Sequence, residues 1–392
     1  MEEGKMEIEK QEIEKPDKGK SIYDLSTPSF LVDIQVYQSN CSRMLELART
    51  AGISLRGQTK THKTVEGGVL QTGGSRRKIV TSTLLECEMY AKSGFEDILF
   101  GFPLIPQHLP RVYKLRSQLD AFHVMVANLE ICIFFQDSTP PQGKKWSIVL
   151  KIDCGNERAG VWWEEASQIL EIARFITASS NLKFQGIYVH CGNSYHSNTP
   201  EQVKDIRNNA LNSVKRIADW LEDEGIKCID VGIGSTPSCS HPTPALSALS
   251  EIHPGNYVFY DAMQMELGSC QESDIAGTVL TRIIGHYPRR NQLLIDCGFT
   301  GFTKQGLGKQ QDKRMLARIK GCPELMVTDM TQEIGFVDSS DSSLKIQFEK
   351  FPVGSTLQLI PYHSCATAAC YNIYHVHREE KVTDTWAPCK GW

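Results

Sequence analysis

The stretch Ile53-Ser-Leu-Arg-Gly-Gln-Thr59, which continues as Lys60-Thr-His-Lys-Thr64, sets the pattern from which the fold can be predicted. A short extended run leads into a segment of helical character, and a lysine stands at the junction. In parallel α/β proteins, reactive side chains are exposed at the carboxyl ends of strands. Lys60 is therefore placed to bond covalently to a carbonyl compound. The spacing alone also suits an ordinary surface lysine at a helix start, so other motifs must decide.

The same alternation of extended and helical segments repeats as far as Asp261. Extended segments are predicted over residues 53–59, 78–82, 97–102, 122–126, 147–153, 184–190, 228–233 and 256–260. Apolar residues three and four positions apart predict helices over residues 36–51, 84–92, 166–178 and 201–223. Eight β units separated by helices are typical of an α/β fold in which a parallel sheet closes into a (β/α)8 barrel. A doubly wound open sheet is the alternative.

A second pattern begins after residue 262. Strand-like runs separated by Gly, Pro, Asp and Ser turns occupy residues 277–284, 292–296, 344–348 and 356–360. They predict an all-β domain over residues 263–392, which follows a barrel domain over residues 21–262. Residues 21–33 precede the first barrel unit and are expected to pair with the β domain. Residues 1–20 hold seven acidic residues, five lysines and no aromatic residue, and are predicted to be a disordered charged tail.

The composition excludes several classes of protein. The chain has 392 residues, a formal charge of −4 and a pI near 6.3, which does not favour nucleic acid or an anionic membrane as a partner. No run of 18 apolar residues predicts a transmembrane helix, and the first twenty residues lack the apolar region of a secretory signal. The 13 cysteines are odd in number and form no Cys-x-x-Cys pair, so a cytoplasmic location is expected.

A candidate metal pair lies near the other end of the chain, in Pro361-Tyr-His363-Ser-Cys365. Two residues apart on a strand, the imidazole and the thiol would share one face, and both are ligands that Zn2+ prefers. Structural zinc sites need four protein ligands, and no second pair lies nearby. The spacing leaves two interpretations open: an open catalytic zinc site, or a buried thiol beside a hydrogen-bonded histidine.

Polar residues also gather at three other predicted strand ends. Tyr188 and Tyr195 flank one of them, where a tyrosine can bond a phosphate or relay a proton, or else belong to the core. The loops 232–238 and 254–257, with Thr236, Gly255 and Asn256, follow the last two predicted strands. Barrels commonly bind phosphate there. No Gly-x-x-x-x-Gly-Lys-Ser/Thr motif is present, so a nucleoside triphosphate is not indicated.

Taken in order, the motifs resemble those of the eukaryotic D-serine dehydratases. This family consists of zinc-dependent pyridoxal 5′-phosphate (PLP) enzymes with an alanine racemase-like fold and has D-threonine aldolases as relatives. The resemblance runs from about residue 27 to the end of the chain. The motifs that carry it are Lys60-Thr-His-Lys-Thr, Glu66-Gly-Gly, Asp153-Cys-Gly-Asn, His190-Cys-Gly-Asn, Gly234-Ser-Thr-Pro-Ser-Cys-Ser-His241, His253-Pro-Gly-Asn-Tyr257, Leu267-Gly-Ser-Cys270 and Pro361-Tyr-His-Ser-Cys-Ala-Thr-Ala.

The resemblance implies a PLP-binding barrel, a C-terminal β domain and a homodimer. By position, Lys60 would hold PLP and act in catalysis, and His363 and Cys365 would bind Zn2+. The residues around the cofactor would be Tyr188, Tyr195, Thr236, Gly255 and Asn256. His253 would face the pyridine nitrogen of PLP, and a neutral histidine there would leave that nitrogen unprotonated.

One departure from the family pattern lies just before the lysine. The family has Arg-Pro-His-x-Lys, whereas this chain has Arg56-Gly57-Gln58-Thr59-Lys60. The lysine remains, so the departure puts the rate and the substrate preference in doubt more than it does cofactor binding.

The activity that the resemblance implies is that of a carbon–nitrogen lyase, which converts D-serine to pyruvate and ammonia. D-threonine is a second candidate substrate. Lys60 would remove the α-proton, and zinc would assist the departure of the β-hydroxyl group. Three alternatives remain: another lyase for β-hydroxy-D-amino acids, such as a D-threonine aldolase or a 3-hydroxyaspartate dehydratase; an amino-acid racemase; and a non-catalytic PLP-binding protein.

Overall fold

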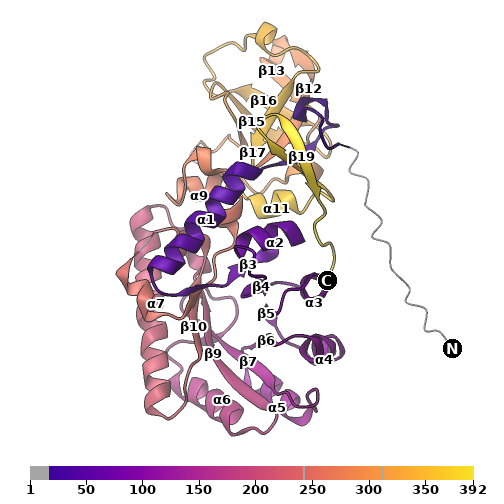
Figure 1. Ribbon diagram of the computed structural model, residues 1–392. Coiled ribbons are helices and arrows are strands. Elements are labelled where there is room, and N and C mark those ends of the chain that lie inside the picture. Colours follow the sequence, from indigo (N-terminus) through magenta and orange to yellow (C-terminus); the bar gives the residue numbers. More distant parts are fainter. Residues whose placement is uncertain (1–16, 242, 311) are drawn as a thin grey trace, which may run out of the picture.

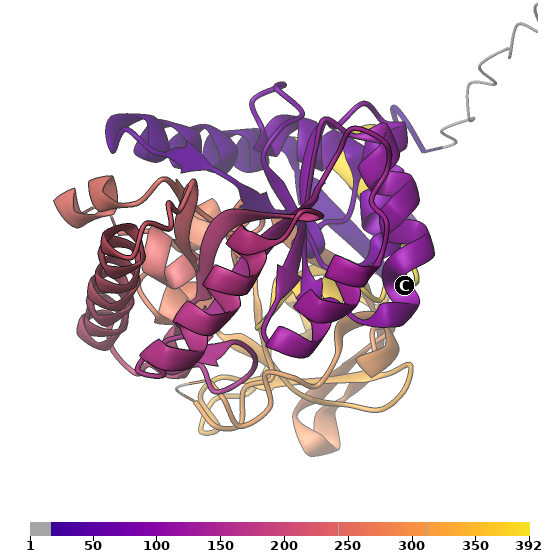
Figure 2. The same ribbon diagram turned by 90° about the horizontal axis from the view of Figure 1, so that it is seen from below.

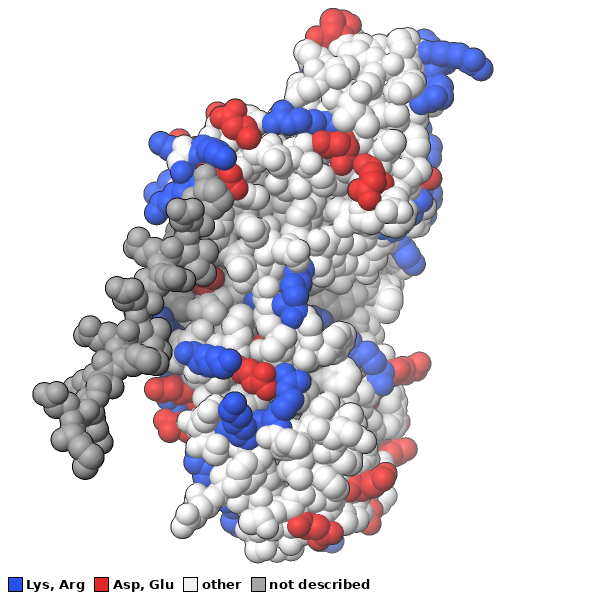
Figure 3. All heavy atoms as spheres, turned by 90° about the vertical axis from the view of Figure 1, so that its right-hand side faces the viewer, with Lys and Arg blue, Asp and Glu red and all other residues white. Residues whose placement is uncertain are grey.

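The computed structural model describes residues 17–241, 243–310 and 312–392. A barrel forms the lower part of the molecule in Figure 1, and a β unit rises above it. Within the described residues, no helix is long and apolar enough to cross a membrane. Basic and acidic side chains are interspersed on the face shown in Figure 3.

The parallel strands form a closed ring. β2 (Ser54–Leu55) and β3 (Gly57–Gln58) are separated only by Arg56 and act as one segment. β2 pairs with β11 (Glu251–Ile252), and β3 pairs with β4 (Ile79–Thr81), so this segment closes the sheet. Between them lie, in spatial order, β5 (Asp97–Pro103), β6 (Ala121–Val126), β7 (Trp146–Asp153), β9 (Leu182–His190) and β10 (Asp230–Gly234), while the short β8 (Val161–Trp162) pairs with β7. The predicted (β/α)8 barrel is confirmed, and the open sheet is excluded.

Helices surround this ring, as Figure 2 shows. They are α1 (Ile34–Thr50), α2 (Val65–Gln71), α3 (Leu84–Lys92), α4 (Leu109–Gln118), α5 (Leu129–Asp137), α6 (Ala166–Ala178) and α7 (Pro200–Asp223). Each predicted helix agrees with the structure to within two residues at either end. Side-chain caps explain several starts, because Thr64, Thr83, Asn128 and Thr199 each accept a backbone N–H of the first turn.

The predicted eighth strand at residues 256–260 is wrong. The eighth strand is β11, and residues 256–258 form the short 3-10 helix η6 (Asn256–Val258). The apolar run Tyr257-Val-Phe-Tyr260 has the composition of a strand, but the Asn256 carbonyl accepts the N–H groups of Phe259 and Tyr260 at 2.9 and 2.8 Å. Local turn bonds therefore replace a ladder with a neighbouring strand.

The C-terminal part is a nine-stranded sheet in the order β13-β16-β15-β14-β17-β12-β1-β18-β19, with β13 also paired to β12. Its strands are β1 (Ser29–Asp33), β12 (Gly277–Tyr287), β13 (Gln292–Ile295), β14 (Ala317–Ile319), β15 (Leu325–Met330), β16 (Gly335–Ser339), β17 (Thr356–Ile360), β18 (Tyr374–Arg378) and β19 (Lys381–Trp386). β1 pairs with β12 and with β18, so the segment before the barrel belongs to this sheet. The described residues hold four further short helices: α8 (Thr236–Cys239) lies between β10 and β11, and α9 (Ala262–Glu266), α10 (Phe299–Phe302) and α11 (Ser364–Ala368) come after β11.

One further strand prediction is wrong. Residues 344–348 form no strand, since the Ile346 N–H bonds to the Asn291 side chain and the 3-10 helix η9 (Phe348–Lys350) follows. The predicted charged tail lies outside the described residues except for residues 17–20. Those four residues are anchored, because Gly19 donates to the Val382 carbonyl and Val382 donates back to Lys20.

An aromatic cluster joins the β unit to the barrel. Phe30 of β1 lies 5.4 Å from Phe259 and 5.0 Å from Tyr374 of β18, and Tyr37 of α1 lies 5.3 Å from Trp386 of β19, all between ring centroids. All five rings are buried. Pairs of this kind contribute about 1 kcal/mol each beyond the area they bury. The cluster holds the β unit over the carboxyl ends of the barrel strands, where α11 packs against the 3-10 helix η2 (Thr59–Thr61).

Candidate active site at the carboxyl end of the barrel

Lys60 lies in η2, directly after β3, at the carboxyl end of the first barrel strand. Its side chain is exposed, and its backbone N–H donates to Gln58 Oε1 at 3.1 Å. A Cβ at residue 57 would stand 2.7 Å from the Gln71 amide, so Gly57 leaves room for that side chain. The two residues that depart from the family pattern thus shape the turn that carries the lysine.

Cys365 meets this turn from the far end of the sequence. Its Sγ lies 3.2 Å from Thr61 Oγ1, a contact between residues 304 positions apart. Cys365 is in the first turn of α11, and His363 is the residue that precedes this helix. The pair therefore does not lie on a strand, and the argument that alternate strand residues share one face does not apply to it. Both side chains are half-buried and remain accessible.

His363 and Cys365 stabilise each other's charged forms. Burial raises the pKa of Cys365, but the neighbouring His363, with Lys60 and Thr61, outweighs burial and lowers this pKa to about 7. Burial lowers the pKa of His363, but Cys365 and Asp261 outweigh it and raise this pKa to about 8. The thiolate is the form of cysteine that binds metal ions.

Asp261 anchors the start of α11 and was missed by sequence reasoning. It is fully buried, and its Oδ2 accepts the Ser364 N–H at 2.8 Å and the Ser364 hydroxyl at 3.1 Å. Burial raises the pKa of Asp261, while the nearby His363 opposes that rise. The bonds to Ser364 fix the residue between His363 and Cys365. No spacing rule in the sequence joins residue 261 to residue 364.

The donor set suits one half of a zinc site. Among the described residues, no group of three or more His, Cys, Asp and Glu side chains could hold a metal ion. An imidazole nitrogen with a thiolate sulfur is nonetheless the donor chemistry that Zn2+ prefers. His363 Nδ1 lies 3.1 Å from Gln305 Oε1, which leaves Nε2 as the nitrogen available to a metal. The pair fits a metal whose other ligands are not protein groups.

Tyr188 and His253 stack in the mouth of the barrel. Their rings lie 4.3 Å apart at an angle of 27°, and both are buried. Tyr188 packs on a layer of inward-facing side chains that consists of Val80, Leu99, Met125 and Val149. Burial lowers the pKa of His253 to about 4, against the opposing effect of Glu251. The imidazole is therefore uncharged at neutral pH.

The two glycine and hydroxyl loops lie side by side, since the Tyr257 N–H donates to Thr236 Oγ1 at 3.1 Å. In the first loop, Ser235 bonds to Ser194 and Ser238 at 2.9 and 2.8 Å. In the second, Gly255 packs against Gln58, whose carbonyl oxygen would stand 2.9 Å from a Cβ. Within the described residues, the buried atoms His253 Nδ1 and Asn256 Oδ1 have no partner with hydrogen-bond geometry. Such a cradle, with unpartnered polar atoms around it, fits a polar cofactor.

The remaining predicted cofactor residues lie on the metal side. Asn256 donates to Asp261 at 2.6 Å and to Ser364 at 2.9 Å, so it links the last barrel loop to α11. Tyr195 lies in η4 (Gly192–His196). Burial, and next the Cys365 thiolate, raise the pKa of Tyr195, and Tyr195 packs against the same small cluster as Tyr362, which precedes His363.

Lys151 is a second cation that sequence reasoning missed. It lies in β7, next to Tyr188 in the strand register, and is 4% exposed. Burial, together with Arg158 and Lys60, lowers the pKa of Lys151 to about 8, although Asp153 opposes this shift. Among the described residues, no carboxylate lies within ion-pair distance of this amine. A lysine inside the apolar run Ile148-Val-Leu-Lys-Ile152 was the available signal.

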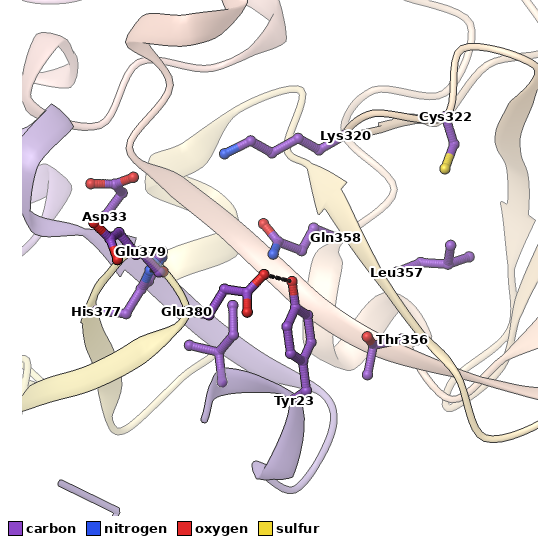
Figure 4. Close-up of a pocket in the computed structure, with 11 residues that line it drawn as sticks. Tyr23, Asp33, Lys320, Cys322, Thr356, Leu357, Gln358, His377, Glu379 and Glu380 are labelled. Carbon is purple, nitrogen blue, oxygen red and sulfur yellow. Dashed lines mark hydrogen bonds between the residues drawn. The ribbon is translucent and has the colours of Figure 1, made fainter. Parts of the chain in front are cut away.

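A hollow of about 360 Å3 lies elsewhere, on the β unit. Figure 4 shows its wall, where Tyr23 donates to Glu380 at 3.1 Å and Lys320 faces acidic residues. None of the residues described above lines it. A second hollow, of about 330 Å3, opens at the amino ends of the barrel strands, around Arg56, Asp97 and Asp230.

The chain is similar to known proteins along nearly its whole length. Residues 32–262 match the family model of the alanine racemase N-terminal domain, and residues 276–377 match a serine dehydratase domain. A D-serine dehydratase of Dictyostelium discoideum is 36% identical over 95% of this chain and 98% of its own length. A D-serine dehydratase of Schizosaccharomyces pombe is 30% identical over 99% of this chain and 97% of its own.

Solved structures show the same likeness. The D-threo-3-hydroxyaspartate dehydratase of Delftia sp. HT23 has a TM-score of 0.89 and 26% identity, over 95% of this chain and 100% of that one. A mutant of that enzyme has been solved in a metal-free form.

Proposed function

Because this chain belongs to the family of D-serine dehydratases built on the alanine racemase N-terminal barrel, we propose that it converts D-serine to pyruvate and ammonia. The chain is an enzyme of the lyase class, as its relatives along nearly the whole sequence are. The proposal concerns the substrate, the cofactors and the residues that act on them.

We propose PLP as the organic cofactor, which supplies an electron sink for negative charge at the α-carbon of the substrate. Lys60 would hold it covalently, because this amine is exposed at the carboxyl end of the first strand. Tyr188 would support the ring, and Thr236 and Gly255 would line the paired loops after β10 and β11. Released from the cofactor, the Lys60 amine would take the α-proton as the general base.

We propose Zn2+ as the second cofactor, held by His363 and Cys365, where it supplies a Lewis acid for a departing hydroxyl group. Gln305 would orient the imidazole through Nδ1. Asp261 would hold the helix start that separates the two ligands. Tyr195 and Asn256 border this side of the site, and Asn256 bonds to the same aspartate.

A single observation carries the proposal: the 3.2 Å contact between Thr61 and Cys365. Thr61 follows Lys60 directly, and the charge of Lys60 acts on both His363 and Cys365, so the candidate base lies near the candidate metal pair. A β-elimination needs a base at the α-carbon and an acid at the leaving group on the adjacent β-carbon. This chain brings both from opposite ends of its sequence.

The test is a substrate panel with metal analysis of the same sample. Purified protein, loaded with PLP, is incubated with D- and L-serine, D-threonine and D-threo-3-hydroxyaspartate, and pyruvate, other keto acids and glycine are measured. We expect pyruvate from D-serine, and a loss of activity after chelation that zinc restores. Activity that is unaffected by metal removal would refute the role of zinc, and glycine with an aldehyde as products would show an aldolase.

The second candidate activity is 3-hydroxyaspartate dehydration. The solved Delftia relative carries this name, and the buried Lys151 with Arg158 gives the site positive charge beyond what the carboxylate of serine needs. A dicarboxylate substrate would use both cations. The same panel separates the two activities by their relative kcat/KM values.

We further propose a homodimer located in the cytosol. All thirteen cysteines are free, which suits a reducing compartment. Light scattering on the purified chain measures the oligomeric state directly.

We further propose that the chain divides into a barrel domain of residues 21–262, with residues 21–33 paired to the β sheet, and a β domain of residues 263–392.

A further inference from the structure

The side chain of His253 packs against two barrel strands, β9 and β10. Its ring is buried against Tyr188. A Cβ on Gly232 would stand 2.2 Å from His253 Nε2, and one on Gly234 would stand 2.6 Å from the histidine Cβ. No side chain fits at either position of β10. The Gly-Ile-Gly sequence of this strand therefore makes room for an imidazole as much as for a ligand.

One nitrogen of this ring lies near a carboxylate, and the Arg56 backbone is a further hydrogen-bonding group beside the ring. His253 Nε2 lies 3.8 Å from Glu251 Oε1, at ion-pair distance. Nδ1 is buried and has no hydrogen-bond partner among the described residues. A neutral imidazole carries one proton, on either nitrogen, and the neighbouring groups decide which.

Glu251 remains a carboxylate although it is buried. Its Oε1 accepts from Arg56 Nε at 2.9 Å, and Lys78 Nζ lies 3.3 Å from Oε2. Burial raises the pKa of Glu251, but Arg56 and His253, with Lys78, outweigh burial and lower this pKa to about 2. Arg56 is itself held by Asp97 at 2.5 Å and Asp230 at 3.8 Å. The negative charge beside Nε2 is thus fixed in place by the charges at the barrel floor.

We propose that Glu251 is a positioning residue that keeps the single imidazole proton of His253 on Nε2 and leaves Nδ1 as a lone-pair acceptor. Only the assignment of His253 to the PLP ring rests on the proposed function. A ligand nitrogen that bonds to Nδ1 must then supply the proton itself. This reverses the expectation that a neutral histidine leaves the pyridine nitrogen of PLP unprotonated.

Nitrogen NMR of the full chain tests the proposal. Two-bond 1H–15N spectra of 15N-histidine-labelled protein distinguish the two neutral tautomers from the cation, with PLP bound and without it. The signals that disappear in His253→Gln belong to His253. We expect the Nε2–H tautomer at neutral pH in both forms. In Glu251→Gln, we expect the Nδ1 and Nε2 shifts to move towards each other as the two tautomers mix.

Asp230→Asn is the matched control, because it removes a carboxylate from the same Arg56 but none beside His253. Its His253 shifts should equal those of the unmodified chain. If Glu251→Gln does not fold, Glu251→Asp moves the carboxylate away from Nε2 and should give the same mixing. A proton on Nδ1 in the unmodified chain, or identical shifts in it and in a folded Glu251 variant, overturns the proposal. Because the spectra need no substrate, a chain inactive on D-serine would leave this result intact.

Discussion

At the scale of single residues, Lys60 is distinguished from its neighbour Lys63 by what each touches. The Lys60 side chain is exposed at the end of the first strand. Lys63 is paired with Glu86 at 3.2 Å, and its backbone carbonyl accepts the Cys389 N–H. Lys63 therefore has a structural role, while the Lys60 amine is available to react with a cofactor.

Replacing Lys60 by Ala should remove the visible absorbance of lysine-bound PLP and lower kcat by a factor of about 10³ or more, because base and anchor are lost together. Lys63→Ala, the control, should retain both the absorbance and most of the activity. Loss of the absorbance in Lys63→Ala alone would move the anchoring role to that residue.

The metal pair offers a second test at this scale. Cys365→Ala should lower bound zinc to a small fraction of one equivalent and reduce dehydratase activity, since a half-site cannot hold the metal with one protein ligand. Cys370→Ala, which alters an exposed cysteine five residues further on, should bind zinc as the unmodified chain does. Plasma emission analysis of dialysed samples gives the stoichiometry. Equal zinc content in both variants would remove Cys365 from the site.

At the scale of elements, the short strands and turns at the barrel mouth matter more than the long helices. β10 offers glycine where His253 needs space, and η2 presents Lys60 to α11. α11 itself is only five residues long, so its place depends on Asp261 and on packing rather than on helical propensity.

Gly232→Ala tests the fit between β10 and the loop after β11. The new Cβ would collide with His253 Nε2, so we expect a displaced imidazole and weaker PLP binding by at least about tenfold, with a stability loss of about 1–3 kcal/mol. Adding His253→Ala removes the obstacle and should restore part of the stability, as contacting residues are not additive. PLP titration and thermal unfolding measure both effects. Equal stability losses in the single and the double variant would contradict the contact.

At the scale of the whole molecule, buried neutral histidines link folding to pH. Burial lowers the pKa of His62 to about 4, while Gln71 and Thr64 oppose this. Between pH 6.5 and 4 the unfolded chain binds a proton at this histidine and the folded chain does not. The free energy of unfolding must therefore fall as the pH falls through this range.

His62→Gln should remove the pH-dependent contribution of His62 to the free energy of unfolding. A pKa shift of that size corresponds to about 3 kcal/mol. The variant loses packing at every pH, but its free energy of unfolding should fall less steeply from pH 6.5 to pH 4 than that of the unmodified chain. Urea unfolding at several pH values measures this slope. His196→Gln, at an exposed histidine, should show the unmodified slope, and parallel curves for His62→Gln would contradict the prediction.

The sequence by itself determined the barrel, because alternating apolar runs and helical periodicity are local patterns that burial in a closed parallel sheet requires. It indicated Lys60 by its place at a strand end, and it offered His363 and Cys365 as a pair. It misplaced the eighth strand because the turn bonds of Asn256 outweigh the strand-like composition of Tyr257–Tyr260.

Only the tertiary structure decided which residues meet. Thr61 and Cys365 are in contact across 304 positions, and Asp261, Glu251 and Lys151 have roles that depend on neighbours distant in sequence. The physical reason is that a charge or a hydrogen bond acts over a few ångströms of space and is indifferent to chain separation. Local patterns specify elements, whereas packing those elements places the acid, the base and the metal ligands together.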